Sequence, residues 1–374
     1  MTRVLAARLD SDGDVLLTGP ALRALSATAH GTGAGGGRLD LLASPAGAGA
    51  ARLLPGVDEV LVFDPPWSGF TPVPVDPTAV TALVELVRGR GYDEAVVFTS
   101  FHQSPLPLAL LLRLAGVPRI AAASEDYPGS LLDVRHRREV PGAPERHEVD
   151  AALDVARAAG HELPAGDDGR LRVRADLPGA RAALGGLLPE DPFAVVHPGA
   201  SVPARAPSPE EAVRIAAALA ADGWPVVVTG GPGETALTAR VAAGCGGTDL
   251  GGRTDLPVLA GVLAEAAVVV VGNTGPAHLA AAVGTPVVSL FAPVVPAARW
   301  APHGVPVALL GDQGAACAGS RARTCPVPGH PCLDGVVPAA AVAAAAALAG
   351  RDDPRGRRAA ERAAAPTTLA GGRL

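Results

Sequence analysis

The sequence predicts an α/β protein made of two doubly wound, Rossmann-like domains that follow one another in the chain. Its 374 residues exceed the usual length of one domain. Short apolar runs of strand length alternate with amphipathic helical stretches. This rhythm occurs twice, with an irregular stretch at 137–190 between the two occurrences. Such alternation implies right-handed crossovers and parallel sheets that are covered on both faces.

The elements can be placed in order along the chain. The first half contains five apolar runs that we expect to be strands, with helices between them: 4–9, 38–44, 59–64, 94–100 and 119–124. The irregular stretch contains a helix near 148–160. The second half has a helix at 209–222 and four more expected strands: 193–199, 225–231, 268–275 and 286–291. We therefore predict domains at 1–180 and 181–350, and a disordered tail at 351–374.

Composition narrows the class of protein. Hydrophobic residues make up 48% of the chain and aromatic residues only 3%, so the cores must be built from Ala, Val and Leu. The formal net charge of −6 argues against nucleic acid as a partner. All 31 basic residues are arginines, so every cation is a guanidinium able to bind an anion in a fork. With no signal peptide and no apolar stretch long enough to span a bilayer, we expect a cytoplasmic protein that can still touch a membrane surface peripherally.

Three aspartates stand close together in RLDSDGDVLLTGPALRAL, at Asp10, Asp12 and Asp14. A calcium loop starting at Asp10 would need Gly and Glu where Val15 and Ala21 stand, and an Asp-x-Asp metal site has no further ligand in view. Asp14 follows Gly13 and opens the first helix, just beyond the first strand. Ligands of open α/β sheets bind at that edge, so Asp14 is a candidate functional carboxylate. Plain capping or solvation of the turn stays an open alternative.

The segment HPGASVPAR (197–205) follows an expected strand and is rich in small residues. Its backbone N–H groups, the hydroxyl of Ser201 and the guanidinium of Arg205 are suited to a phosphate group. The alternative is an ordinary loop rich in Pro and Gly.

The stretch VVVVGNTGPAHLAAAVGTP (268–286) favours an anion site. Asn273, Thr274 and Gly275 form the turn after a buried strand, and Pro276 takes the preferred first position of a helix. His278 lies in the first turn of that helix. Free N–H groups and the helix dipole attract negative charge there, although a lone histidine more often serves local hydrogen bonding.

Two glycine-rich segments suggest a dinucleotide site. GTGAGG (31–36) follows a helix and precedes a strand, which is the wrong context. GGPGETA (230–236) is better placed, but the carboxylate of Glu234 would repel a pyrophosphate and fits a ribose hydroxyl pair instead.

Three cysteines near the end of the chain, with His330 among them, have separations that fit no common zinc site: Cys317, Cys325 and Cys332. We interpret them as free or structural thiols.

Taken together, five motifs resemble glycosyltransferase family 9, typified by the ADP-heptose:lipopolysaccharide heptosyltransferases. They are RLDSDGDVLLTGPALRAL, HPGAS with Arg205, VVVTGGPGE, DLGGRTDLPVLAGVLAEA and VGNTGPAHLAAAVGTPVVSLF, which keep this order over about residues 3–345. The resemblance implies a GT-B fold, in which two Rossmann-like domains face a cleft. It also implies an acceptor site in the N-terminal domain, a nucleotide-sugar site in the C-terminal domain, and no metal or other cofactor.

The resemblance assigns roles residue by residue. Asp14 falls on the catalytic base, with Gly13, Asp10 and Asp12 shaping its turn. The donor diphosphate would meet Ser201, Arg205, Thr274, Gly275 and His278, and the donor sugar and ribose would meet Asn273 and Glu234. The chain departs from the family at RAPSP, which lacks the usual Trp-Pro, at Asn273, where many members have aspartate, and at Asp12, which replaces an apolar residue.

These assignments predict an inverting, metal-independent transfer of a heptose-like sugar from a nucleoside diphosphate, ADP-heptose foremost, to a hydroxyl of a glycan, lipid-linked or secondary-metabolite acceptor. Asp14 would take the proton of the attacking hydroxyl. An NAD-dependent oxidoreductase that uses GGPGETA is an alternative, as is a non-catalytic nucleotide-binding GT-B scaffold. A nucleotide-sugar epimerase is the nearest enzymatic alternative.

Overall fold

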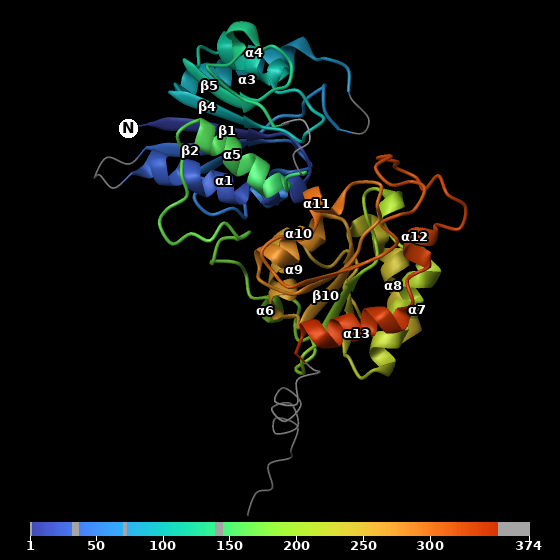
Figure 1. The fold of residues 1–374 in the computed structure, drawn as a ribbon. Coiled ribbons are helices and arrows are strands. Elements are labelled where there is room, and N and C mark those ends of the chain that lie inside the picture. The colour runs from blue at the N-terminus through green and yellow to red at the C-terminus, as the bar shows by residue number, and fades with distance from the viewer. Residues whose placement is uncertain (1, 32–36, 70–72, 139–144, 351–374) are drawn as a thin grey trace, which may run out of the picture.

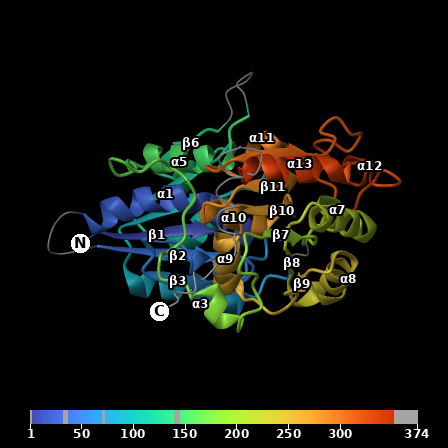
Figure 2. The same ribbon diagram turned by 90° about the horizontal axis from the view of Figure 1, so that it is seen from below.

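The computed structural model describes residues 2–31, 37–69, 73–138 and 145–350, which form two α/β domains (Figure 1). Each domain contains one six-stranded sheet in which all strands pair in parallel. Figure 2 shows the two sheets with helix α10 (Gly275–Ala282) between them. The predicted fold, two Rossmann-like domains, is therefore confirmed.

The N-terminal sheet has the strand order β3-β2-β1-β4-β5-β6. Its strands are β1 (Arg3–Arg8), β2 (Arg38–Ala43), β3 (Glu59–Val62), β4 (Glu94–Phe98), β5 (Arg119–Ala123) and β6 (Val134–His136). The helices of this domain are α1 (Asp12–His30), α2 (Ala48–Ala51), α3 (Pro77–Arg90), α4 (Leu106–Leu114) and α5 (Glu148–Ala158), with a short 3₁₀ turn at Gly129–Leu131.

The C-terminal sheet repeats this topology with the order β12-β11-β10-β7-β8-β9. Its strands are β7 (Ala194–His197), β8 (Val226–Val228), β9 (Thr248–Asp249), β10 (Val268–Gly272), β11 (Val287–Leu290) and β12 (Val307–Leu310). Besides α10, its helices are α6 (Ala180–Ala183), α7 (Pro209–Ala221), α8 (Thr235–Cys245), α9 (Leu256–Glu265), α11 (Ala297–Trp300), α12 (Pro331–Asp334) and α13 (Pro338–Leu348), with 3₁₀ turns at Pro203–Arg205 and Pro232–Glu234.

Burial on both faces explains why the strands are almost wholly apolar. Along β1, Val4 and Ala6 pack in the cluster that includes α1 and α5, while Leu5 and Ala7 pack in the cluster that includes α3 and α4. This alternation is the two-residue period of a strand that is covered on both sides. Helix starts follow local chemistry, as at α9, where the Asp255 carboxylate accepts the Val258 N–H at 2.9 Å.

The topology places one switch point in each sheet. Strand order reverses between β1 and β4 in one sheet and between β7 and β10 in the other. Ligands of such sheets bind beyond the carboxyl ends of the strands at these points. Helices α1 and α10, which start at the two switch points, contact each other. One apolar cluster includes both helices, so the cores of the two domains join there.

The predicted strands are all present, and the predicted helices are found at α5 and α7. Three outer strands, β6, β9 and β12, were not predicted. Strands β6 and β9 have only three and two residues, which is too few for a periodic pattern, and the side chains of β12 are only partly buried or exposed. The proposed domain boundary at 180/181 stays a prediction; α6 begins at Ala180 and packs against α9.

The predicted tail at 351–374 and most of GTGAGG lie outside the described residues. No helix among the described residues is both long and apolar enough to cross a bilayer.

Candidate active site

Asp14 lies in the first turn of α1, directly beyond the carboxyl end of β1. The helix begins at Asp12 with Ser11 as its N-cap, so Asp14 is its third residue and not the cap. The Ser11 hydroxyl donates to Asp14 Oδ2 at 2.9 Å, and Arg8 Nη2 lies 3.3 Å from Asp14 Oδ1. The carboxylate is 22% exposed, so it is held in one orientation and still reaches solvent.

Arg8 is the buried cation beneath this carboxylate, and its side chain is only 2% exposed. Its Nε lies 2.7 Å from Asp10 Oδ2, and its Nη2 donates to the Ser100 hydroxyl at 2.8 Å. A second buried carboxylate, Glu148, lies 3.8 Å from Arg8 Nη2. Sequence reasoning missed both Arg8 and Glu148; an arginine ending the apolar run VLAAR was the available signal.

Asp10 and Asp12 are each held by a neighbouring segment of the N-terminal domain. Gln103 Nε2 donates to Asp10 Oδ1 at 2.6 Å, and burial raises the pKa of Asp10 while the charge of Arg8 lowers it. The Ala50 N–H donates to Asp12 Oδ1 at 2.8 Å, which ties α1 to α2. Burial raises the pKa of Asp12 as well.

The turn before α10 lies against the turn that carries Asp14. A Cβ built on Gly13 would stand 3.1 Å from His278 Cδ2 and 3.3 Å from Gly275 Cα. The structure therefore brings Gly13, Gly275 and His278 together, although 261 residues lie between the first two in the sequence. Burial lowers the pKa of His278 to about 4, so its imidazole is neutral at pH 7.

Asn273 and Thr274 complete this turn in different ways. Asn273 is buried, and its amide exchanges two hydrogen bonds with the backbone of Ala292: Nδ2 donates at 3.2 Å and Oδ1 accepts at 3.1 Å. This side chain therefore fixes the turn to the strand edge. Thr274 is the N-cap of α10, and its extended backbone brings the start of the helix to the domain junction.

Arg205 reaches the same junction from the HPG loop. Its backbone passes so close to the end of β10 that a Cβ on Gly272 would lie 2.3 Å from the Arg205 carbonyl oxygen, so only glycine fits there. Burial lowers the pKa of the Arg205 guanidinium, and the charge of Asp14 opposes this effect. The two charges thus act on each other across the junction. Ser201 is exposed in the loop before Arg205.

Glu234 connects the HPG loop with the GGPGE loop. Its Oε2 accepts the Gly231 N–H at 2.7 Å, and a Cβ on Gly199 would stand 1.9 Å from its Oε1. The carboxylate therefore lies directly over Gly199. A pyrophosphate bound to the Gly231 N–H, as in the dehydrogenase alternative, would have to displace this anion, so that alternative has lost its structural basis.

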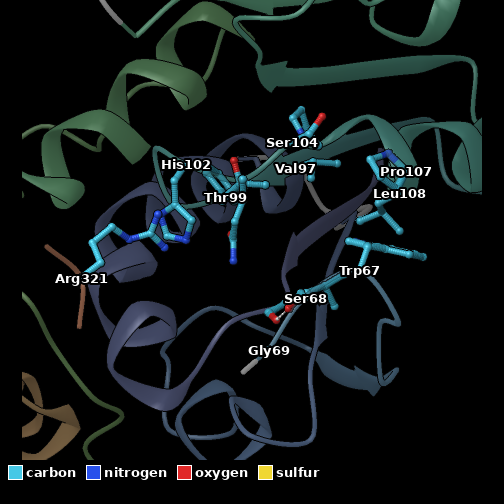
Figure 3. Close-up of a pocket in the computed structure, with 14 residues that line it drawn as sticks. Trp67, Ser68, Gly69, Val97, Thr99, His102, Ser104, Pro107, Leu108 and Arg321 are labelled. Atoms are coloured by element: carbon cyan, nitrogen blue, oxygen red, sulfur yellow. Dashed lines mark hydrogen bonds between the residues drawn. The ribbon is translucent and has the colours of Figure 1, made fainter. Parts of the chain in front are cut away.

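A cavity of about 350 Å³ opens over the ends of β1 and β4, where Leu9, Phe98 and Thr99 line it. Trp67 forms one wall, His102 and Gln103 form the other, and Arg321 of the C-terminal domain closes one end. Figure 3 shows the Arg321 side chain reaching toward His102. Sequence reasoning missed this cavity, because its walls come from segments that carry no motif.

The cysteines are free thiols, as expected. Burial raises the pKa of Cys332 to about 11, and the thiols of Cys317 and Cys325 nearby raise it further. Among the described residues, no group of three or more His, Cys, Asp or Glu side chains is arranged to hold a metal ion.

Comparison with known proteins agrees with this architecture. The chain is similar to lipopolysaccharide heptosyltransferase 3 of Escherichia coli strain K12, with 36% identity over 117 residues, which is 30% of this chain and 34% of that protein. The match thus spans about a third of that relative. Two solved structures share the fold at 17% identity. E. coli ADP-heptose lipopolysaccharide heptosyltransferase II has a TM-score of 0.71 and matches 94% of this chain and 100% of its own. A family 9 glycosyltransferase from Veillonella parvula has a TM-score of 0.74, and the match covers 94% of this chain and 98% of that one.

The family model for glycosyltransferase family 9 (heptosyltransferase) matches residues 80–329, which is more than half of the chain and includes the loops of Arg205, Glu234 and His278. The resemblance noted in the sequence is thereby confirmed: the chain belongs to glycosyltransferase family 9.

Proposed function

We propose that this chain is an inverting, metal-independent glycosyltransferase that moves a heptose-like sugar from a nucleoside diphosphate, ADP-heptose foremost, to a hydroxyl of a glycan, lipid-linked or secondary-metabolite acceptor. One observation carries the proposal. The partly exposed carboxylate of Asp14 lies at a domain junction opposite Arg205, Gly275 and His278. This pairs a base with a cationic and amide-rich surface suited to a leaving diphosphate.

The chemistry follows from this placement. Asp14 accepts the proton of the acceptor hydroxyl as that oxygen attacks the anomeric carbon, and the bond to the diphosphate oxygen breaks on the opposite side. Arg205 and the N–H groups at the start of α10 balance the charge that develops on the leaving group. Arg8 and Ser11 hold the base in position. His278 is neutral, so it contributes a hydrogen bond and no charge.

Donor recognition is proposed for two further loops. Ser201 and Thr274 would contact the donor diphosphate, and Glu234 is suited to a ribose hydroxyl pair. Asn273, which the resemblance assigns to the donor sugar or ribose, also holds the turn before α10 through its bonds to Ala292. The choice of ADP-heptose is supported by the structure of E. coli heptosyltransferase WaaC with ADP-2-deoxy-2-fluoro heptose, which is similar in fold (TM-score 0.60, 22% identity).

Thermal unfolding with ADP, UDP, GDP and NADH tests the proposal first. At 100 times its dissociation constant, a ligand adds about 2.7 kcal/mol to the free energy of unfolding. We expect ADP to stabilise the protein, and Arg205→Gln to remove most of this effect. Arg240→Gln, in an exposed pair with Glu210, is the matched control.

Mass spectrometry measures the transfer of heptose from ADP-heptose to an acceptor, with EDTA present to remove metal ions. NMR then identifies the anomer that is formed. Stabilisation by NADH alone, a product that retains the donor's configuration, or activity lost in EDTA would each overturn the corresponding part of the proposal.

A further inference from the structure

Glu148 is a buried carboxylate that the proposed chemistry does not use. It is the first residue of α5, and its side chain is only 1% exposed. Neither of its carboxylate oxygens has a hydrogen-bond partner among the described residues. Burial raises the pKa of Glu148, while the charges of Arg8 and Arg138 lower it. A buried anion is costly unless cations or a helix N-terminus compensate it, so the groups around this carboxylate must account for its presence.

Each oxygen of Glu148 faces a guanidinium from a different domain. Oε2 lies 3.8 Å from Nη2 of Arg8, at the end of β1. Oε1 lies 4.0 Å from Nη1 of Arg299, in α11 of the C-terminal domain. Both distances are within the range of an ion pair and beyond that of a hydrogen bond. Arg138, which follows β6, and Asp14 of α1 also act on the charge of Glu148. The carboxylate therefore stands between the two domains, next to the proposed base.

Arg299 is held at this place by residues of the N-terminal domain. Its guanidinium lies 4.3 Å from the centroid of the Phe101 ring, and its Nε lies 3.5 Å from Glu145 Oε1. The next residue, Trp300, packs on the same ring, with 5.7 Å between the two centroids. The segment that starts α5 and helix α11 therefore form one contact between the domains, in which a cation of one domain meets carboxylates of the other.

Arg8 connects Glu148 with Asp14 through a single nitrogen. The Arg8 Nη2 that faces Glu148 also lies 3.3 Å from Asp14 Oδ1, and it donates to the Ser100 hydroxyl at 2.8 Å. The two carboxylates therefore compete for one nitrogen. A carboxylate that is fully paired with a guanidinium is a weaker proton acceptor, because the positive charge stabilises its ionised form. A second negative charge beside Arg8 opposes this effect.

We propose that Glu148 is a positioning residue that shares Arg8 with Asp14 and so keeps the base able to accept a proton. Arg299 holds Glu148 in this role from the C-terminal domain, so the strength of the base depends on contact between the domains. The inference rests on the proposed function, in which Asp14 is the base. Further titratable groups act on Asp14 from the elements around it, and the variants below leave them in place: Asp10, His102, Arg205 and His278.

The acid midpoint, which is the pH below the optimum at which kcat falls to half its plateau, tests the inference. Glu148→Gln keeps the shape of the side chain and removes its charge, so Arg8 acts on Asp14 unopposed. We expect the acid midpoint of heptose transfer to move lower by about one pH unit, and the plateau of kcat to fall by up to about tenfold, because a weaker base accepts the proton less readily. KM for ADP-heptose should not change, since the effect concerns the proton acceptor.

NMR gives a second midpoint that does not depend on turnover. Protein with isotope-labelled aspartate carboxyl carbons reports the uptake of a proton by Asp14, whose signal is assigned by its loss in Asp14→Asn. We expect this midpoint to be lower in Glu148→Gln than in the wild type, which is the direction expected for the kinetic midpoint.

Further variants assign the effect to residues. Glu145→Gln is the matched control: it removes an exposed carboxylate that pairs with Arg299, and both midpoints should stay as in the wild type. Glu148→Asp moves the charge away from Arg8 and should give a smaller shift in the same direction, so it serves as the test if Glu148→Gln does not fold. Arg299→Gln combined with Glu148→Gln should have the midpoints of Glu148→Gln alone, because Arg299 acts through Glu148.

Unchanged midpoints in Glu148→Gln, or in Glu148→Asp where the first variant does not fold, would overturn the inference, because a merely structural role lowers kcat equally at every pH. An equal shift in Glu145→Gln would overturn it as well, since the effect would then not pass through Arg8. Failure of the proposed function looks different. A wild-type protein that transfers no sugar at any pH overturns the transferase, while the NMR midpoints still decide whether Glu148 and Asp14 share Arg8.

Discussion

Gly13 of α1 lies against His278 of α10, with only 3.1 Å between the position of an added Cβ and the imidazole Cδ2. This contact joins the turn of the proposed base to the turn of the proposed diphosphate site. Because each turn belongs to a different domain, the space at Gly13 determines how closely the two halves of the site approach.

Replacement of Gly13 should separate the two half-sites. An alanine Cβ would be tight against His278 and Gly275, and a valine would force the helices apart. We expect Gly13→Ala to lower kcat moderately, and Gly13→Val to abolish most transfer and to lower the melting temperature as well, because the cores of the two domains join at this contact. Gly89→Ala in α3 is the control, because no atom lies within 4 Å of its Cβ position, and helix propensity should stabilise it by up to about 1 kcal/mol. Full activity of Gly13→Val would contradict this prediction.

The two aspartates of the turn should differ in their contribution to catalysis. Asp14→Asn removes the proposed proton acceptor and should lower kcat by about 10²–10⁴. Asp12→Asn keeps a carbonyl oxygen for the Ala50 N–H and should leave kcat within about threefold of the wild type. Steady-state transfer rates with ADP-heptose give both values. If the Asp12 variant were the inactive one, the assignment of the base to Asp14 would be wrong.

Gly199 and Glu234 should act as one unit in donor binding. A Cβ at position 199 would stand 1.9 Å from Glu234 Oε1, so Gly199→Ala must displace the carboxylate. We expect Gly199→Ala and Glu234→Ala each to weaken ADP about tenfold, and the double variant to be no worse, since both remove one ribose contact. Calorimetry with ADP measures the cycle, and a 3′-deoxyribose analogue should show no difference among the four proteins. Additive losses would show that the residues act separately.

Asp167 should make stability depend on acid. Arg23, in α1, donates two hydrogen bonds to its carboxylate at 2.6 and 2.8 Å, and these hold the pKa of Asp167 at about 2. A carboxyl group whose pKa is lower in the folded protein stabilises it above the unfolded value, near 3.9, and loses this effect as pH falls toward 2. Asp167→Asn should therefore cost about 2 kcal/mol at pH 7, and the difference from wild type should close between pH 4 and pH 2.

Urea unfolding at pH 7, 4 and 2.5 measures this difference. The control is Asp176→Asn, which removes an exposed surface pair with Arg174 and should change little at any pH. A constant deficit for Asp167→Asn from pH 7 to pH 2.5 would show that the loss does not arise from the ionised pair.

Much of the site was accessible from sequence because its parts follow buried strands. Parallel strands end at the same edge of their sheet. Asp14 could therefore be placed at the edge of the N-terminal sheet, after β1, and Arg205 and His278 at the edge of the C-terminal sheet, after β7 and β10. The family motifs supplied their roles. The edge strands were less accessible: β9 has two residues and β6 has three, too few for a periodic pattern.

What the sequence determined by itself is local: the strand and helix pattern, the turns that follow the strands, and the membership of a family whose motifs it contains. The tertiary structure alone decided which turns face each other. The close approach of Gly13 to His278, the burial of Arg8 and Glu148 beneath Asp14, and the reach of Arg321 into the other domain all join residues far apart in the chain. Such contacts depend on the packing of two domains against one another, and no periodicity in a sequence records which surfaces will meet.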